Sequence, residues 1–219
     1  MGVGSKFSSD VFPTRGLSKF VAWLAGRESP IVVDLGLAVG VNVTFLGQLL
    51  SCKLYVEDLL SRTEVWWPTP PDGQVDAGNK SEENDAEAKA LARHTARRLG
   101  HATDSVDGVL CWDVFDYLDS DAANTLADEV TRVLKPGGVV FLCHWPQKRA
   151  VTEPVQYEIV DDRTLRFWAH GAARPQPSVR ESRAFTKMFA DLTVCNSFLL
   201  TSRMREVVFR KPPASASAD

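Results

Sequence analysis

The first candidate for chemistry is the segment Asp34–Asn42, which reads DLGLAVGVN. Glycines directly after a strand let the backbone approach a nucleotide-like ligand closely, and the carboxylate of Asp34 can orient the ligand or the loop. A dinucleotide-binding fingerprint needs G-x-G-x-x-G, whereas Ala38 and Val41 stand here at the second and third glycine positions. The segment therefore indicates a nucleotide-like ligand and argues against NAD.

The second candidate is the acidic pair Glu57 and Asp58, which follows an expected strand at 53–56. A carboxylate at the carboxyl end of a strand can accept two hydrogen bonds from a ribose diol. The structural alternative is a helix N-cap or a solvated strand end. Both the position of the pair and its chemistry favour ribose binding, so the pair is a candidate ligand site.

Further polar residues follow two later apolar runs. Trp112 and Asp113 end the run at 106–112, and His144 follows the run at 139–143. A histidine in this place could act as a base near neutral pH. The other histidines are interpreted as solvated (His94) or without an identifiable partner (His101 and His170).

Alternating strands and helices are expected to position these residues. Short apolar runs rich in β-branched residues are typical of strands buried on both faces, and the segments between them have helical periodicity. This alternation predicts a mainly parallel sheet with helices on both faces, whose ligands bind at the carboxyl ends of the strands. The expected strands are 31–33, 53–56, 106–112 and 139–143, and the expected helices are 13–27, 41–50, 81–99 and 120–134.

The last third of the chain has a different pattern. Runs at 155–160 and 164–168 flank a turn at 161–163 and predict a hairpin, and a short helix is expected at 180–189. Runs at 192–200 and 205–210 predict a closing antiparallel pair. We expect one domain over residues 13–211, with an irregular loop at 61–80, a hairpin insertion at 154–169, and disordered ends at 1–12 and 212–219.

Composition excludes several classes of protein. The net charge of −3 and the pI of about 5.8 argue against a general affinity for nucleic acid. The four cysteines form no CxxC pair, so we expect reduced core thiols and no metal site. Neither a hydrolase elbow nor a phosphate-binding loop is present. Without an apolar run long enough for a membrane span, a cytoplasmic location is expected.

Four segments, in this order, resemble class I S-adenosylmethionine-dependent methyltransferases. They are Asp34–Asn42, Glu57–Asp58, Asp107–Phe115 and Glu129–Leu142, and the helix-Leu-Lys-Pro-Gly-Gly-strand element in the last of them is the most specific. The loop at 36–42 and the element at 52–59 are also similar to a bacterial subgroup of methyltransferase-like proteins with a degenerate first motif. The resemblance implies a Rossmann-like α/β fold with a mainly parallel seven-stranded sheet and an antiparallel last strand.

The same resemblance implies S-adenosylmethionine as cofactor and a role for each matching residue. Asp34, Gly36 and Gly40 would line the methionine end of the cofactor, and Glu57 or Asp58 would hold the ribose hydroxyls. Ala38 and Asn42 belong to the same cofactor loop.

The resemblance places Trp112 and Asp113 at the substrate end of the site, with Trp112 also beside the cofactor. With His144, Asp113 is a candidate catalytic residue. The reaction implied is an in-line methyl transfer driven by proximity and orientation, with a base only where the acceptor needs one. The acceptor, a small molecule or a protein, and the oligomeric state cannot be inferred from the sequence.

Two departures from the family motivate an alternative hypothesis. Ala38 stands where the family carries an extra glycine, and the usual third strand with its acidic residue is not evident. Trp66 and Trp67 lie in that stretch, where they could cover a flat ligand or pack as a lid. The alternative is a catalytically inactive methyltransferase-like protein that acts as a binding or scaffolding module.

Overall fold

The computed structural model describes residues 10–59, 99–147, 155–169 and 179–214. The loop predicted at 61–80 lies outside these residues, as do Trp66, Trp67, His94 and His170 and all of the helix predicted at 81–99 except Leu99. Among the helices that the structure describes, none is long and apolar enough to cross a membrane.

A large mixed sheet forms the centre of the molecule. Its strand order is β3-β2-β4-β5-β9-β8, with parallel pairing from β3 to β5 and antiparallel pairing of β9 with both neighbours. This confirms the predicted mainly parallel sheet with an antiparallel last strand. The described residues contribute six strands, and they do not test the predicted count of seven. The strands are β2 (Ile31–Asp34), β3 (Lys53–Val56), β4 (Val106–Trp112), β5 (Leu134–His144), β8 (Thr193–Leu199) and β9 (Arg205–Arg210).

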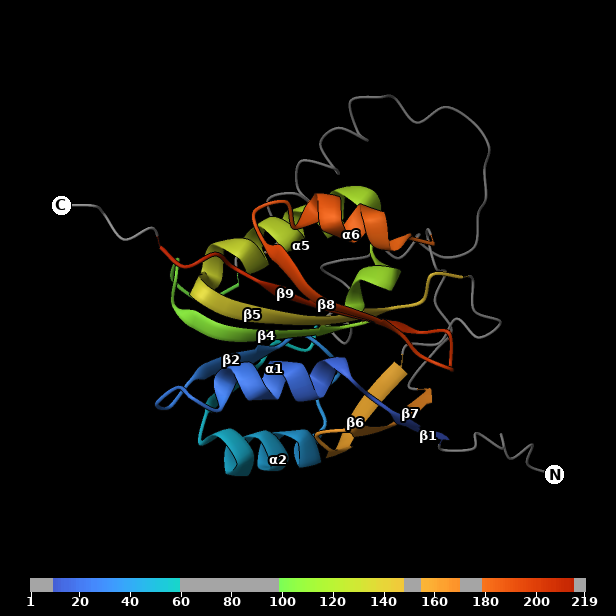
Figure 1. Cartoon of the computed structure of the whole chain (residues 1–219), viewed down its shortest axis with the longest axis horizontal. Helices are drawn as coiled ribbons and strands as arrows, with labels where there is room; N and C mark the ends of the chain where they lie inside the picture. The colour runs from blue at the N-terminus through green and yellow to red at the C-terminus, as the bar shows by residue number, and fades with distance from the viewer. Residues whose placement is uncertain (1–9, 60–98, 148–154, 170–178, 215–219) are drawn as a thin grey trace, which may run out of the picture.

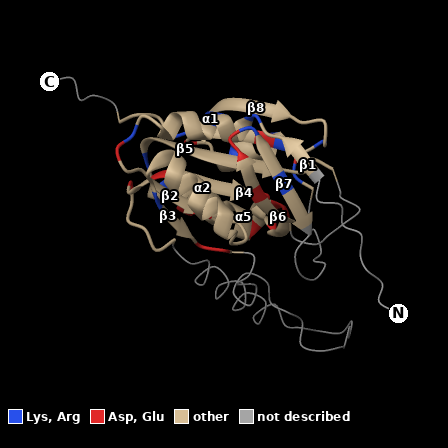
Figure 2. Cartoon of the chain, turned by 90° about the horizontal axis from the view of Figure 1, so that it is seen from below, with Lys and Arg blue, Asp and Glu red and all other residues tan. Residues whose placement is uncertain are grey.

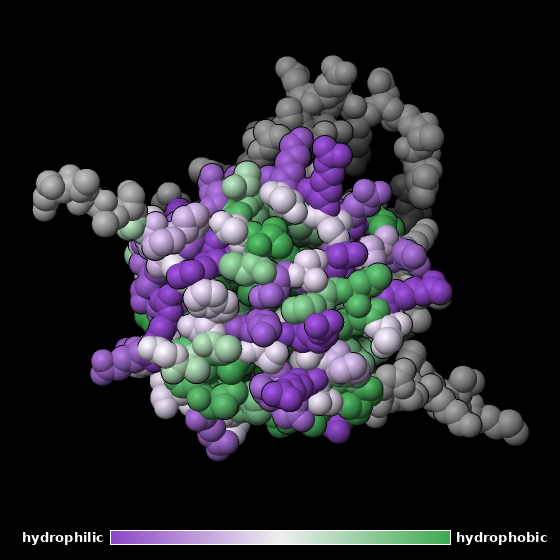
Figure 3. Space-filling view, viewed as in Figure 1, coloured by the Kyte–Doolittle hydropathy of each residue, from purple (hydrophilic) through white to green (hydrophobic). Residues whose placement is uncertain are grey.

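Helices cover both faces of the sheet, as predicted (Figure 1). Helices α5 (Ser120–Val133) and α6 (Ser182–Met188) lie on one face, and α1 (Gly16–Leu24) and α2 (Gly40–Leu50) lie on the other. Every residue of β4 is buried, which is why its sequence is a nearly continuous apolar run. Successive residues of β5 enter opposite cores, with Leu142 facing α5 and α6 and Phe141 facing α1. On the face that Figure 3 shows, apolar patches alternate with hydrophilic residues.

Polar side chains satisfy the ends of two helices. The carboxylate of Asp119 accepts a hydrogen bond from the backbone of Ala122 at the start of α5. At the start of α1 the carboxylate comes from a distant strand, because Glu206 of β9 accepts hydrogen bonds from the backbone N–H groups of Arg15 and Gly16. Glu206 thereby connects the last strand of the chain to its first helix.

The Lys-Pro-Gly-Gly segment lies within β5 and does not separate α5 from a strand at 139–143. Strand β5 begins at Leu134, directly after α5 ends at Val133. Leu134 pairs with Val106, the first residue of β4, and this pairing with a distant segment extends the strand beyond its apolar part. Gly137 has φ +76, a left-handed conformation that glycine adopts without strain.

A second sheet of three strands packs beside α2 at one end of the molecule (Figure 2). The predicted hairpin is present as β6 (Val155–Asp161) and β7 (Thr164–Ala169). The third strand, β1 (Asp10–Pro13), pairs with β7 and lies inside the segment that was expected to be disordered. Local sequence could not indicate this strand, because its partner lies about 150 residues further along the chain.

Asp107, at the start of β4, connects three segments and should contribute measurably to stability. It accepts hydrogen bonds from Arg27, Lys135 and the backbone of Ile31. Burial acts to raise the pKa of Asp107, but these donors together hold it below its usual range. The carboxylate therefore stabilises the fold above about pH 4, and this stabilisation is lost as the pH falls through the lowered pKa.

We expect Asp107→Asn to lower the free energy of unfolding by about 1–3 kcal/mol at pH 7, since one amide group would face cationic donors. Urea unfolding followed by circular dichroism measures the loss, which should shrink as the pH is lowered towards 3. The matched control is Asp104→Asn. It removes an ion pair between Lys211 and a half-exposed carboxylate, for which about 0–1 kcal/mol is expected. Equal losses in the two variants would contradict the assignment.

Candidate functional site

The polar residues predicted from sequence meet at the carboxyl ends of three adjacent strands. The loop after β2 carries Gly36 and Gly40, while Glu57 and Asp58 follow β3. Backbone hydrogen bonds hold these strand ends together, since Glu57 donates to the carbonyl of Asp34 and Leu35 donates to that of Leu110 at the end of β4. The structure thus brings the predicted loop and the acidic pair to one edge of the sheet.

Asp34 is a buried carboxylate with only 2% of its surface exposed. One oxygen, Oδ1, accepts hydrogen bonds from the backbone N–H of Gly36 at 2.9 Å and from Nε1 of Trp112 at 2.8 Å. Burial raises the pKa of Asp34 to about 6; these two hydrogen bonds offset the rise in part, and the nearby Asp58 adds to it. Both donors are neutral, and among the described residues no cation bonds to this carboxylate.

The indole of Trp112 lies directly against Gly36. A Cβ atom added to Gly36 would collide with the ring and lie 2.9 Å from its Nε1. The indole stacks on Tyr157, with ring centroids 5.2 Å apart and planes inclined by 6°, and it meets the edge of Phe141. Trp112 has φ +46, an uncommon conformation for a bulky residue and one that marks functional or strained sites.

Tyr157 of β6 is a site residue that sequence reasoning missed. Its hydroxyl donates a hydrogen bond to Oδ2 of Asp113 at 3.0 Å, and the hydroxyl of Tyr117 donates to the same oxygen at 3.4 Å. Tyr157 alternates with Val155 and Ile159 as the buried residues of β6. This period of two was visible in the sequence, but the surface that the buried side covers was not.

Asn42, predicted to bind the cofactor, instead joins α2 to the small sheet. Its side chain is buried and donates to the carbonyl of Tyr157, while its oxygen accepts from the backbone of Ile159. The amide is thus used by the fold. In the same loop Ala38 and Gly40 are exposed, and a Cβ on Gly40 would meet no atom within 4 Å.

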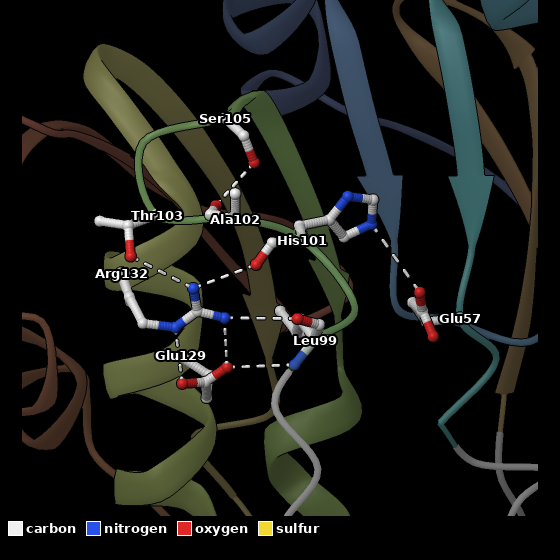
Figure 4. Close-up of polar contacts among 8 residues, drawn as sticks. All are labelled: Glu57, Leu99, His101, Ala102, Thr103, Ser105, Glu129 and Arg132. Carbon is white, nitrogen blue, oxygen red and sulfur yellow. Dashed lines mark hydrogen bonds and ion pairs between the residues drawn. The ribbon is translucent and has the colours of Figure 1, made fainter.

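The ribose candidate Glu57 has a neighbour that the sequence did not reveal. Nε2 of His101 lies 3.8 Å from Oε1 of Glu57, whose side chain is 21% exposed, and the imidazole packs edge-on against Tyr55. Figure 4 shows the His101 side chain pointing towards Glu57. Asp58, the other member of the pair, has φ +42.

The loop that carries His101 is held by Arg132 of α5 (Figure 4). The guanidinium of Arg132 donates to the carbonyls of Leu99 and His101 and pairs with Glu129. Glu129 in turn accepts a hydrogen bond from the backbone of Leu99. The hydrogen bond to Glu129 also raises the pKa of Arg132. A clamp on the outer helix therefore positions His101 beside Glu57.

His144 is placed away from the cofactor loop. It is fully buried, its ring packs on Phe185 of α6, and its Nε2 lies 3.4 Å from the hydroxyl of Ser182. Burial lowers the pKa of His144 to about 4, with a smaller contribution from Arg205, so the ring is neutral at pH 7. Trp112 belongs to the core on the opposite face of the sheet. A catalytic role for His144 stays a prediction, and its neighbours give it a structural environment.

Comparison with known proteins adds family evidence. A family model described as a methyltransferase domain matches residues 69–142, about a third of the chain. No protein of curated function matches the sequence.

Several solved structures share the fold. One is a methyltransferase of Haloferax volcanii in complex with the Trm112 methyltransferase activator, 16% identical, with a TM-score of 0.50 over 90% of this chain and 89% of that one. Another is the [4+2]-cyclase SpnF, 10% identical, with a TM-score of 0.53 over 95% of this chain and 88% of that one. A third is an S-adenosylmethionine-dependent methyltransferase of Aquifex aeolicus, 15% identical, with a TM-score of 0.49 over 89% and 88%. The family model matches a methyltransferase domain over residues 69–142, and the structures with TM-scores of 0.50 and 0.53 share the α/β fold of this chain. The order of the motifs is similar to that of class I S-adenosylmethionine-dependent methyltransferases.

Proposed function

We propose that the protein binds S-adenosylmethionine at the carboxyl edge of β2, β3 and β4 and transfers its methyl group to an acceptor. The observation that carries this proposal is the convergence of Asp34, the Gly36–Gly40 loop and Glu57 at one edge of the sheet. Fold alone would not suffice, because similar folds host different reactions and one similar structure is a cyclase.

The residues present fit the ribose of the cofactor, and they fit its methionine end in part. Ala38 and Gly40 are exposed, which allows close approach of a ligand to this part of the loop. Glu57 offers a partly exposed carboxylate for ribose hydroxyls. At the methionine end, Asp34 supplies a negative charge for an ammonium group, but the indole of Trp112 covers Gly36.

When bound, S-adenosylmethionine would supply an electrophilic methyl group on a sulfonium sulfur. The residues of this chain would contribute binding, orientation and exclusion of water. Asp113 lies beside this edge with the hydroxyls of Tyr157 and Tyr117 on its carboxylate, so it is the group best placed to accept a proton from an acceptor that must lose one.

The acceptor is proposed to be a small molecule or a protein rather than a nucleic acid, since the chain is acidic. The four cysteines are free thiols, which supports a location in the reducing cytoplasm.

The first test is a thermal-shift titration with S-adenosylmethionine and S-adenosylhomocysteine. Ligand at about one hundred times its dissociation constant adds roughly 2.7 kcal/mol to stability. For a domain of this size the melting temperature should rise by roughly 5–11 °C. No rise at millimolar concentrations of either ligand would contradict the proposal and favour the alternative of an inactive binding module.

A second test distinguishes the effect of Asp34 on folding stability from its effect on ligand binding. The raised pKa means that the neutral form favours folding; this contribution is complete below pH 4 and is lost as the pH rises through about 6. Asp34→Asn keeps an oxygen for both hydrogen bonds and removes the buried charge. We therefore expect it to raise the free energy of unfolding by on the order of 1–3 kcal/mol at pH 8 and to change it little at pH 4.

The same variant should bind S-adenosylhomocysteine up to about threefold more weakly, because the carboxylate that faces the ammonium group is gone. Calorimetric titration and urea unfolding measure the two effects. Asp191→Asn, on an exposed loop, is the control and should change stability by less than about 0.5 kcal/mol. A variant that is destabilised at pH 8 and binds the ligand normally would show that Asp34 has only a structural role.

A further inference from the structure

The side chain of Trp112 covers the part of the site that the methionine end of the cofactor would need. Its indole contacts Gly36 so closely that even a Cβ atom would not fit between them. It also takes the hydrogen-bonding oxygen Oδ1 of Asp34. Trp112 is only 2% exposed, so the ring is enclosed within the protein and does not lie on its surface.

The indole is held in this place mainly by the small three-stranded sheet. Tyr157 of β6 stacks on it with nearly parallel planes, and Tyr157 is itself fixed by its hydrogen bond to Asp113 and by the bond from Asn42 to its carbonyl. Gln156, the preceding residue of β6, donates to the carbonyl of Ala38 in the cofactor loop. Strand β6 therefore bridges the cofactor loop and the ring that covers it.

The backbone of Trp112 is in a strained conformation, which points to a role beyond packing. A bulky residue at φ +46 persists only where its surroundings impose it, and such residues cluster at ligand clamps and switch regions. The ribose side of the site is different, since Glu57 keeps a partly exposed carboxylate and Gly40 faces open space.

We infer that Trp112 sets the ligand preference of this site: with the indole on Gly36 the chain binds the adenosine part of the cofactor, and the methionine part gains contacts only when the indole leaves Gly36. This inference rests on the proposed function. Release of the indole would free Oδ1 of Asp34 for an ammonium group and expose the backbone of Gly36. Tyr157 would lose its stacking partner in the same step, so the small sheet and the cofactor loop respond together.

The test compares two probes, adenosine and S-adenosylhomocysteine, by calorimetric titration of the full chain at neutral pH. In the unchanged protein the two dissociation constants should agree within about threefold, because the free energy needed to move the indole offsets the contacts that the methionine part gains. In Trp112→Ser, S-adenosylhomocysteine should bind at least about tenfold more tightly than adenosine. The control is Trp23→Phe, which changes an exposed tryptophan on α1 and should leave both constants unaltered.

A second variant covers the case in which Trp112→Ser does not fold. Trp112→Phe keeps an aromatic ring against Tyr157 but cannot donate to Asp34, so it should shift the preference towards S-adenosylhomocysteine by a smaller factor. The ¹⁵N correlation spectrum of Trp112→Phe lacks the indole N–H signal of Trp112, and this loss identifies the signal in the spectrum of the unchanged protein. In the unchanged protein S-adenosylhomocysteine should move that signal, whereas adenosine should not.

The outcomes distinguish the two proposals. If the unchanged protein already prefers S-adenosylhomocysteine about tenfold or more and neither variant changes this preference, the role of Trp112 is refuted and the proposed function stands. If no variant binds either probe at millimolar concentration, both are refuted. Binding of S-adenosylhomocysteine by the variants alone would overturn both proposals as stated, since it would show that Trp112 blocks the whole site in the unchanged chain.

Discussion

The burial of β4 and β5 between two layers of helices is the constraint on which the other features of this structure depend. The apolar side chains of β4 lie in one core or the other, so its central part cannot hold a polar group at low cost, and Asp107 near its start is buried only with three donors around it. Polar residues can then gather only where the strands end. The carboxyl ends of β2, β3 and β4 meet at one edge, and the loop at Gly36, the acidic pair and Asp113 lie there for that reason.

Three buried acidic side chains of the large sheet have different hydrogen-bond donors around them. Asp107 and Glu206 are surrounded by donors that suit a charge: two cationic side chains and one N–H group for Asp107, and two helix N-terminal N–H groups for Glu206. Asp34 has only two neutral donors on a single oxygen, and burial raises its pKa. An asparagine would serve the same hydrogen bonds, so a carboxylate at this position is explained better by a ligand than by the fold.

The three-stranded sheet distinguishes the carboxyl ends of β2 and β4 in this chain. Through Asn42, Tyr157 and Gln156 it is joined to the loop at 36–40, to Trp112 and to Asp113. Ligands of doubly wound sheets bind outside the carboxyl ends of the strands. Here an inserted strand and the indole that it supports stand over Gly36 at that place, so the small sheet bears directly on the site proposed for the cofactor.

By itself the sequence determined the elements whose formation depends on local pattern: the strands 53–56, 106–112 and 205–210, the helix predicted at 120–134 and found at 120–133, and the hairpin around Asp161. It also predicts the edge of the sheet at which a ligand would bind. Period and turn chemistry decide these over short stretches of chain. Only the tertiary structure decided the partners that come from distant segments. Strand β1 forms by pairing with β7, and the side chain of Asn42 binds β6. The ring of Tyr157 stacks on Trp112, and His101 lies beside Glu57. A hydrogen bond or a stacked pair between residues far apart in the chain leaves no periodic trace in either segment, because its geometry exists only once both are packed.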